Sequence, residues 1–246
     1  MRYFIYIFLL ASQFISAQDF DKANELYRAE KYEASVKEYE KILATGKESS
    51  ELYFNLANAY YKLAKVGPSI YFYEKALLLN PNDSEIENNL KFAQKMQIDD
   101  VKEFKMSGIK SLVTNFTSAF HYNTWAWITV ACAFIFLICF AIYYFTAKTI
   151  LKRIFFIAMF LLIVAIIISI ASALYQKRIV DNQNPAIVYV PIAGVKGEPK
   201  ESASDAFILH EGTKVFVVEK LDNWRKITLA DGNDGWIEAK SLRELR

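Results

Sequence analysis

Cysteine and histidine are scarce in this chain, which has two of each among 246 residues. The two cysteines, Cys132 and Cys139, lie seven positions apart in one apolar run, too far apart on a helix to bond to each other. Two histidines in separate segments add no metal-ligand set, and the chain has no glycine-rich phosphate loop. His210 stands next to Glu211, but no Ser or Cys nucleophile motif accompanies the pair. We therefore expect no enzyme, no cofactor and no metal, with the cysteines as small apolar fillers.

Net charge is also small, at +2. Residues 18–110 carry 14 basic and 16 acidic side chains, and residues 181–246 carry 9 and 11. Nucleic-acid binding is not expected, because it requires a basic stripe on a folded face. The positive surplus lies beside long apolar runs, which is typical of membrane anchoring: Arg2, Lys148, Lys152, Arg153, Lys177 and Arg178.

Hydrophobic residues make up 54% of the chain, and the excess is local. Residues 125–145 and 154–174 are uncharged, and each run would be about 31 Å long as a helix, enough to span a bilayer. Both are predicted to be transmembrane helices. Aromatic residues at their ends suit the headgroup region: Trp125, Trp127, Tyr143, Tyr144 and Tyr175.

The first 17 residues have a basic start, a short apolar stretch and small residues before Gln18, as a secretory signal peptide does. We expect cleavage after Ala17, with an uncleaved anchor as the alternative. The export signal and two spans predict a bacterial inner-membrane protein with both soluble domains in the periplasm. The boundaries are then a juxtamembrane linker at 98–124, a cytoplasmic loop at 146–153 and a second linker at 175–185.

Residues 18–97 contain an internal repeat of 34 residues. Shifted by 34, the stretch 17–47 matches 51–81 at ten positions, which is the period of the tetratricopeptide repeat, or TPR. Ala57 and Ser69 are small where two helices would approach closely, and Gly67-Pro68 is predicted to form the turn between those helices.

Two repeats are fewer than the roughly three that a stable array needs, so a cap is expected. A capping box of Ser84 and Glu87 predicts a cap helix that ends near Gln97. Its apolar face would consist of Ile86, Leu90 and Ala93 or Phe92.

Residues 186–246 change to the short alternating runs of an all-β domain. Five or six strands are expected, with a hairpin turn at 231–235 before Trp236. The spacing of Gly212, Trp224 and the segment Gly235-Trp236-Ile237 resembles a bacterial SH3-type (SH3b) barrel.

The chain thus has, in order, a signal peptide, a TPR pair, a two-helix transmembrane hairpin and an SH3b barrel. With this order the whole chain resembles the BatE-type TPR/SH3b membrane proteins of the Bat (Bacteroides aerotolerance) operon family. The resemblance implies an envelope scaffold for aerotolerance. It also implies partners: membrane proteins with von Willebrand factor A domains and a MoxR-type AAA ATPase.

Two surfaces are candidate binding sites. In TPR proteins the first helix of each repeat lines a concave groove, and two asparagines recurring there could bind a peptide backbone; an alternative is that these residues only cover the stacked repeats. The carboxylate-clamp subtype would have Lys where this chain has Phe20 and Phe54, so an acidic tail is not expected there. The groove positions are Phe20, Asn24, Tyr27, Arg28, Phe54, Asn58, Tyr61 and Lys62. In the barrel, Tyr189, Trp224 and Trp236 are predicted either to line a peptide groove or to fill the core.

These features predict a non-catalytic membrane adaptor that docks proteins or peptides through protein–protein interaction. The alternative is an envelope sensor whose barrel binds cell-wall peptides. The short loop 146–153 argues against the sensor, because it leaves no cytoplasmic domain to receive a signal.

Overall fold

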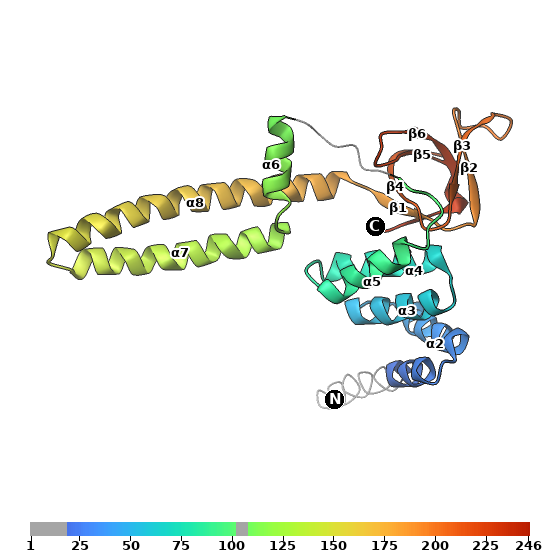
Figure 1. Ribbon diagram of the computed structural model, residues 1–246, viewed down its shortest axis with the longest axis horizontal. Coiled ribbons are helices and arrows are strands. Elements are labelled where there is room, and N and C mark those ends of the chain that lie inside the picture. The colour runs from blue at the N-terminus through green and yellow to red at the C-terminus, as the bar shows by residue number, and fades with distance from the viewer. Residues whose placement is uncertain (1–18, 102–107) are drawn as a thin grey trace, which may run out of the picture. The chain divides into compact units, whose positions relative to one another are not determined.

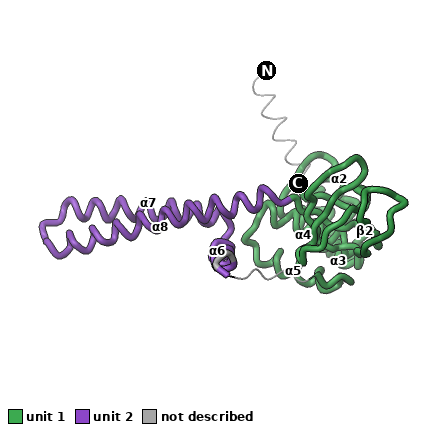
Figure 2. The backbone as a smooth tube through the Cα atoms, turned by 90° about the horizontal axis from the view of Figure 1, so that it is seen from above, with its two compact units in different colours: residues 1–104, 184–246 green, residues 105–183 purple. Residues whose placement is uncertain are grey.

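The computed structural model describes residues 19–101 and 108–246. The predicted signal peptide therefore lies outside the described residues. The chain forms two compact units, one built from residues 1–104 with 184–246 and the other from residues 105–183 (Figure 1, Figure 2). The TPR segment and the β domain thus belong to one unit, although about eighty residues of chain separate them.

The TPR segment is a series of packed helices. They are residues 19–28, α2 (Tyr32–Ala44), α3 (Ser50–Lys62), α4 (Val66–Leu79) and α5 (Ser84–Gln94). Ala57 and Ser69 are fully buried, and the Ser69 hydroxyl donates to the Ala57 carbonyl at 3.1 Å. One period earlier, Ser35 donates in the same way to Ala23 at 2.9 Å. The predicted close approach of the paired helices is confirmed, and a hydrogen bond stabilises it.

Three local predictions about helix ends are wrong. The turn before α4 lies at Ala64 and Lys65, because Ala64 adopts a left-handed φ of 54°, as Glu30 does at 59° one period earlier. Gly67 and Pro68 are already in the first turn of α4. Backbone N–H groups in a first turn have no intrahelical acceptor, so the missing N–H of Pro68 removes no hydrogen bond.

The cap helix also begins and ends differently from the prediction. Asp83, not Ser84, caps α5, since its carboxylate accepts from the N–H groups of Glu85 and Ile86. The helix ends at Gln94, before the predicted Gln97. Ala93 is buried and Phe92 is exposed, which decides between the two alternatives.

The C-terminal domain is an antiparallel sheet of seven strands. In chain order they are β1 (Pro185–Val188), β2 (Ile192–Lys196), β3 (Asp205–His210), β4 (Lys214–Leu221), β5 (Trp224–Thr228), β6 (Asp234–Glu238) and, after the short helix η1 (Ala239–Ser241), β7 (Leu242–Glu244). Their order in the sheet is β3-β2-β6-β5-β4-β1-β7. The sheet curls around its own core, as expected for an SH3b barrel (Figure 1).

Gly235 lies where β2 meets β6, and its lack of a side chain is required there. A Cβ atom at Gly235 would lie 2.6 Å from a methyl of Val195 and 3.0 Å from the Lys196 carbonyl. Only glycine lets these strands approach so closely, and Trp236 then pairs with Lys196. The predicted β5–β6 hairpin is confirmed, with Gly232 at a φ of 91° in its turn.

The barrel packs directly on the TPR helices through apolar contacts. Ile187 of β1 and Leu245 are buried in the hydrophobic cluster of the TPR segment. Two glycines allow this approach. A Cβ atom on Gly67 would lie 3.2 Å from the Val188 carbonyl, and one on Gly212 would lie 2.9 Å from the Ile70 side chain. The barrel therefore covers part of the TPR core that two repeats alone would leave exposed.

Polar contacts hold the same interface. The Asp99 carboxylate accepts from the His210 N–H at 2.7 Å and from the Thr213 hydroxyl at 2.6 Å, and it lies 2.7 Å from His210 Nδ1. Lys214 Nζ forms an ion pair with Glu74 at 2.7 Å. Burial alone would raise the pKa of Asp99, but the hydrogen bonds from Thr213 and His210 outweigh it and hold that pKa below its ordinary value.

His210 and Glu211, adjacent in sequence, both serve this interface. Glu211 accepts the backbone N–H of Gly67 at 3.2 Å, while His210 contacts Asp99. Gln97 donates to the Gly212 carbonyl at 2.5 Å, from the segment that was predicted to be helical.

The second unit consists of α6 (Ile109–Thr117), α7 (Tyr122–Phe145) and α8 (Thr149–Asn182). α7 and α8 pack side by side, and both are long and apolar enough to cross a membrane (Figure 2). They include the predicted spans but extend past them, because polar residues at the ends continue the helix. Lys152 and Arg153 thus lie in the first turns of α8 rather than in a loop. Cys132 and Cys139 are free thiols on α7, and Cys139 is buried.

The Asp99 network predicts a loss of stability in acid. Because folding lowers the pKa of Asp99, its contribution is complete above the unfolded pKa of about 4 and is lost as the pH falls through the folded value. Asp99→Asn should lower the free energy of unfolding at pH 7 by about 1–3 kcal/mol. In this variant the free energy of unfolding should also fall less steeply between pH 5 and pH 3. Both effects can be measured by chemical unfolding of the full chain in detergent. Exposed Asp21→Asn is the matched control, and a variant that follows the wild-type pH curve would contradict the assignment.

Candidate peptide-binding groove

The two asparagines of the predicted TPR groove are held by the same pair of hydrogen bonds in each repeat. Asn24 Oδ1 accepts from the Tyr39 hydroxyl at 2.5 Å and from Asn55 Nδ2 at 3.1 Å. Asn58 Oδ1 accepts from the Tyr73 hydroxyl at 2.5 Å and from Asn89 Nδ2 at 3.4 Å. With both oxygens engaged, each side-chain amide has a fixed orientation.

The tyrosines that fix these amides are buried. Tyr39 and Tyr73 are each 1% exposed, and burial raises the pKa of Tyr39 to about 12 and raises that of Tyr73 as well. Both therefore remain protonated donors at neutral pH. The Nδ2 groups of Asn24 and Asn58 have no described hydrogen-bond partner, so two half-buried donors lie one repeat apart.

A pocket of about 200 Å³ lies at this position. It brings together four predicted residues, Asn24, Tyr27, Arg28 and Asn58, with Tyr39 and Asn55. Arg28 is exposed at its edge, and Tyr27 is half-buried beside Tyr32 at a ring distance of 5.4 Å. The first repeat thus contributes most of the pocket, and Asn58 supplies the neighbouring donor.

The other predicted groove positions lie outside the pocket lining. Phe20 and Phe54 pack against the core tyrosines, with ring distances of 5.9 Å to Tyr39 and 6.0 Å to Tyr73. Tyr61 is half-buried against the TPR core, and Lys62 is exposed.

Sequence reasoning missed Asn55 and Asn89, although a signal was present. The two residues are 34 positions apart, but the second lies in the segment interpreted only as a cap. In α5, Ile86, Leu90 and Ala93 are buried one period after Leu52, Leu56 and Ala59 of α3. α5 therefore corresponds to the first helix of an incomplete third repeat.

The three aromatic residues predicted in the barrel do not form one surface. Trp224 and Trp236 are half-buried on the outer face of β5 and β6, opposite to the buried Ile227 and Ile237, so neither fills the core. Tyr189 instead meets Tyr71 of α4, edge to face, at a ring distance of 5.9 Å.

Comparison with known families agrees with both domains. Residues 50–83 match the family described as Tetratricopeptide repeat, and residues 193–244 match the family described as Bacterial SH3 domain. A comparison with curated proteins found no match. The chain therefore carries a TPR and a bacterial SH3 domain together with two helices apolar enough to span a membrane. Both domains are generally non-catalytic binding modules for proteins or peptides, and a bacterial SH3 domain suggests a location in the envelope.

Proposed function

We propose that the protein is a non-catalytic scaffold of the bacterial inner membrane whose TPR groove docks a partner protein in the periplasm. The observation that carries this proposal is the pair of oriented asparagines, Asn24 and Asn58. Their oxygens are engaged within the fold, which leaves the amide N–H groups available to a ligand. Such donors suit the carbonyl groups of an extended peptide backbone.

The surroundings of the asparagines support a peptide ligand. Tyr27 and Arg28 line the same small pocket, and both residue types carry hydrogen-bond donors that a peptide can use. One or two residues of a partner would fill it, and neighbouring segments would run along the repeat. The resemblance to BatE-type proteins also suggests which partners the scaffold docks. They would be von Willebrand factor A-domain membrane proteins and a MoxR-type ATPase system, together in a Bat aerotolerance complex.

A cell-wall sensor is the second candidate. Trp224 and Trp236 favour it, because half-buried aromatic rings on the outer face of a bacterial SH3 domain offer a surface to a cell-wall peptide.

Exchange of the asparagines for aspartate tests the groove. The double variant Asn24→Asp with Asn58→Asp keeps the side-chain oxygens that accept from Tyr39 and Tyr73. It removes the two amide N–H donors, and the new carboxylates repel a peptide carbonyl. Partner recovery from crosslinked, detergent-solubilised membranes should fall at least about tenfold, with the thermal midpoint nearly unchanged. Asn88→Ala, an exposed amide on α5, is the control. Full recovery with the double variant, or equal loss with the control, would refute docking at this groove.

Reporter fusions test the orientation. A reporter active only outside the cytoplasm should be active after Gln97 and after Arg246, and inactive after Lys148, because an exported N-terminus and two spans return the chain to the same side. Activity after only one of the two domains would exclude a periplasmic location for both.

A further inference from the structure

α6 and the turn that follows it present an exposed apolar face. The four side chains of this apolar face are between 44% and 69% exposed: Leu112, Val113, Phe116 and Phe120. Leu112 and Phe116 are about one helical turn apart, so they share one side of the helix, while Thr114 and Ser118 lie on the opposite side. A contiguous exposed apolar surface of this kind marks an interaction site rather than an ordinary part of a surface in water.

Both long apolar helices hold the C-terminal end of α6. Trp125 of α7 is buried, and its indole Nε1 donates to the Thr117 carbonyl at 2.9 Å. This carbonyl is among the last of α6, which have no acceptor role within the helix itself. From α8, Gln176 Nε2 donates to the Thr117 hydroxyl at 3.2 Å. The position of α6 on the helix pair is therefore fixed by hydrogen bonds from each of its two members.

Aromatic contacts join the apolar face to the apolar surface of α7. The rings of Phe116 and Phe120 each lie 5.4 Å from that of Trp125, measured between ring centres. Trp125 is the first residue of the predicted span 125–145. Beyond it, Trp127 and Phe134 of α7 are exposed. The apolar face of α6 thus adjoins the exposed surface of a helix that is apolar enough to cross a membrane.

The contact with α6 also marks the level at which the apolar run of α8 ends. Gln176 lies just past the predicted span 154–174, and the charged residues Lys177 and Arg178 follow it. Trp125 and Tyr175 stand at the corresponding ends of the two runs, and both are residue types that prefer the headgroup region. In a bilayer crossed by α7 and α8, α6 would therefore lie at the level of the headgroups.

The direction and charge of α6 suit a membrane surface. The helix runs across α8 instead of along it (Figure 1), and in the view turned by 90° it is seen almost end-on beside the pair (Figure 2). An axis that runs across two membrane-spanning helices lies along the plane of the bilayer. The sequence of α6 contains no acidic residue, which the phosphates of anionic lipids would repel.

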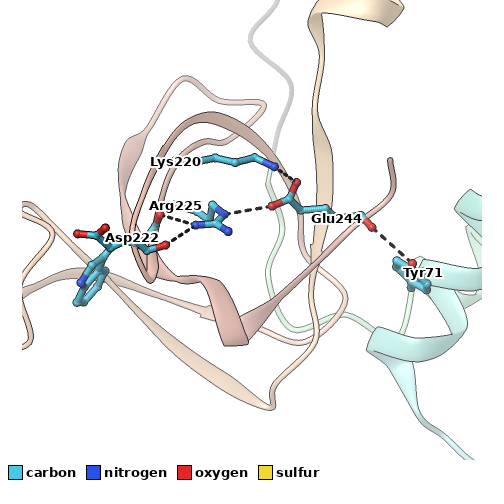
Figure 3. A network of polar contacts seen from close by, with 6 residues as sticks. Tyr71, Lys220, Asp222, Arg225 and Glu244 are labelled. Carbon is cyan, nitrogen blue, oxygen red and sulfur yellow. Dashed lines mark hydrogen bonds and ion pairs between the residues drawn. The ribbon is translucent and has the colours of Figure 1, made fainter.

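An exposed apolar residue of the barrel has different surroundings. Leu221 of β4 is exposed, but its neighbours along the chain take part in polar contacts. Lys220 contacts the Glu244 carboxylate at 2.5 Å, and the Asp222 carbonyl accepts from Arg225 at 3.0 Å (Figure 3). A single apolar side chain among charged groups is normal for a surface in water. Leu221 therefore offers a matched control, exposed and apolar but without a contiguous apolar face.

We propose that α6 is an interfacial helix that lies flat in the headgroup layer of the bilayer, with its apolar face among the lipid acyl chains. The proposal rests on α7 and α8 crossing that bilayer, as in the proposed function. Lipid removes the apolar face from water, which favours this position. Because α6 is bound to both spans, it fixes the depth at which the pair crosses the membrane.

Spin labels on single cysteines test this position in the full chain with Cys132→Ala and Cys139→Ala. The protein is placed in vesicles of phosphatidylethanolamine and phosphatidylglycerol. Oxygen concentrates among acyl chains and a nickel chelate stays in water, so the ratio of their collision rates gives the depth of each label. Labels at Leu112→Cys and Phe116→Cys should lie in lipid at a depth of about 5–10 Å.

Three further labels serve as controls. Ser118→Cys, on the polar side of α6, and Leu221→Cys, in the barrel, are at exposed positions and should collide mainly with the chelate, as groups in water do. Phe134→Cys, in the middle of α7, should lie deeper in the lipid than either label on the apolar face.

The labels separate failure of this proposal from failure of the membrane assignment. A Phe134 label in water would contradict the crossing itself, and with it the proposed membrane scaffold. If that label lies in lipid, chelate contact on both sides of α6 would overturn the interfacial helix. Low collision rates with both reagents at Leu112 and Phe116 would mean that protein covers the apolar face, and they would overturn it as well.

Discussion

The close approach of the barrel to the first turn of α4 is the constraint on which the rest of this unit depends. Gly67 and Gly212 lack the side chains that would separate the two domains, and the Gly67 N–H donates to Glu211 across the contact. Ile187 can then enter the TPR core, and Asp99 can reach the turn between β3 and β4. The same approach brings Tyr71 of α4 into edge-to-face contact with Tyr189 of the barrel.

This contact answers the difficulty of a short repeat array. Two TPR units leave the last helix pair with an uncovered face, and α5 supplies only the first helix of a third unit. The barrel contributes Ile187 and Leu245 to the same core, so a domain from the other end of the chain contributes to the cap. The chain leaves this unit for the two apolar helices and then returns to complete it.

Local patterns predicted much of the fold and some residues of the candidate groove. The 34-residue period identified Asn24 and Asn58, and the alternating runs with Gly235-Trp236 identified the barrel, because period and turn chemistry are local properties. The contact between the domains could not be predicted, since Gly67 suits a turn as well as a close approach, and His210-Glu211 has no local feature that marks it as an interface. The sequence likewise suggests one surface for Tyr189, Trp224 and Trp236, because the identity of an aromatic residue does not specify which neighbour it contacts.

The dependence of both domains on Gly67 is the most direct test of the account. A Cβ atom at position 67 would lie 3.2 Å from the Val188 carbonyl, whereas one at Gly197, in the barrel, would meet nothing within 4 Å. In the full chain in detergent, Gly67→Val should therefore weaken the TPR helices and the barrel together, and Gly197→Val should leave both nearly unchanged, as followed by hydrogen exchange in each domain. Unchanged exchange in Gly67→Val, or faster exchange in the TPR helices alone, would contradict a single unit of TPR and barrel.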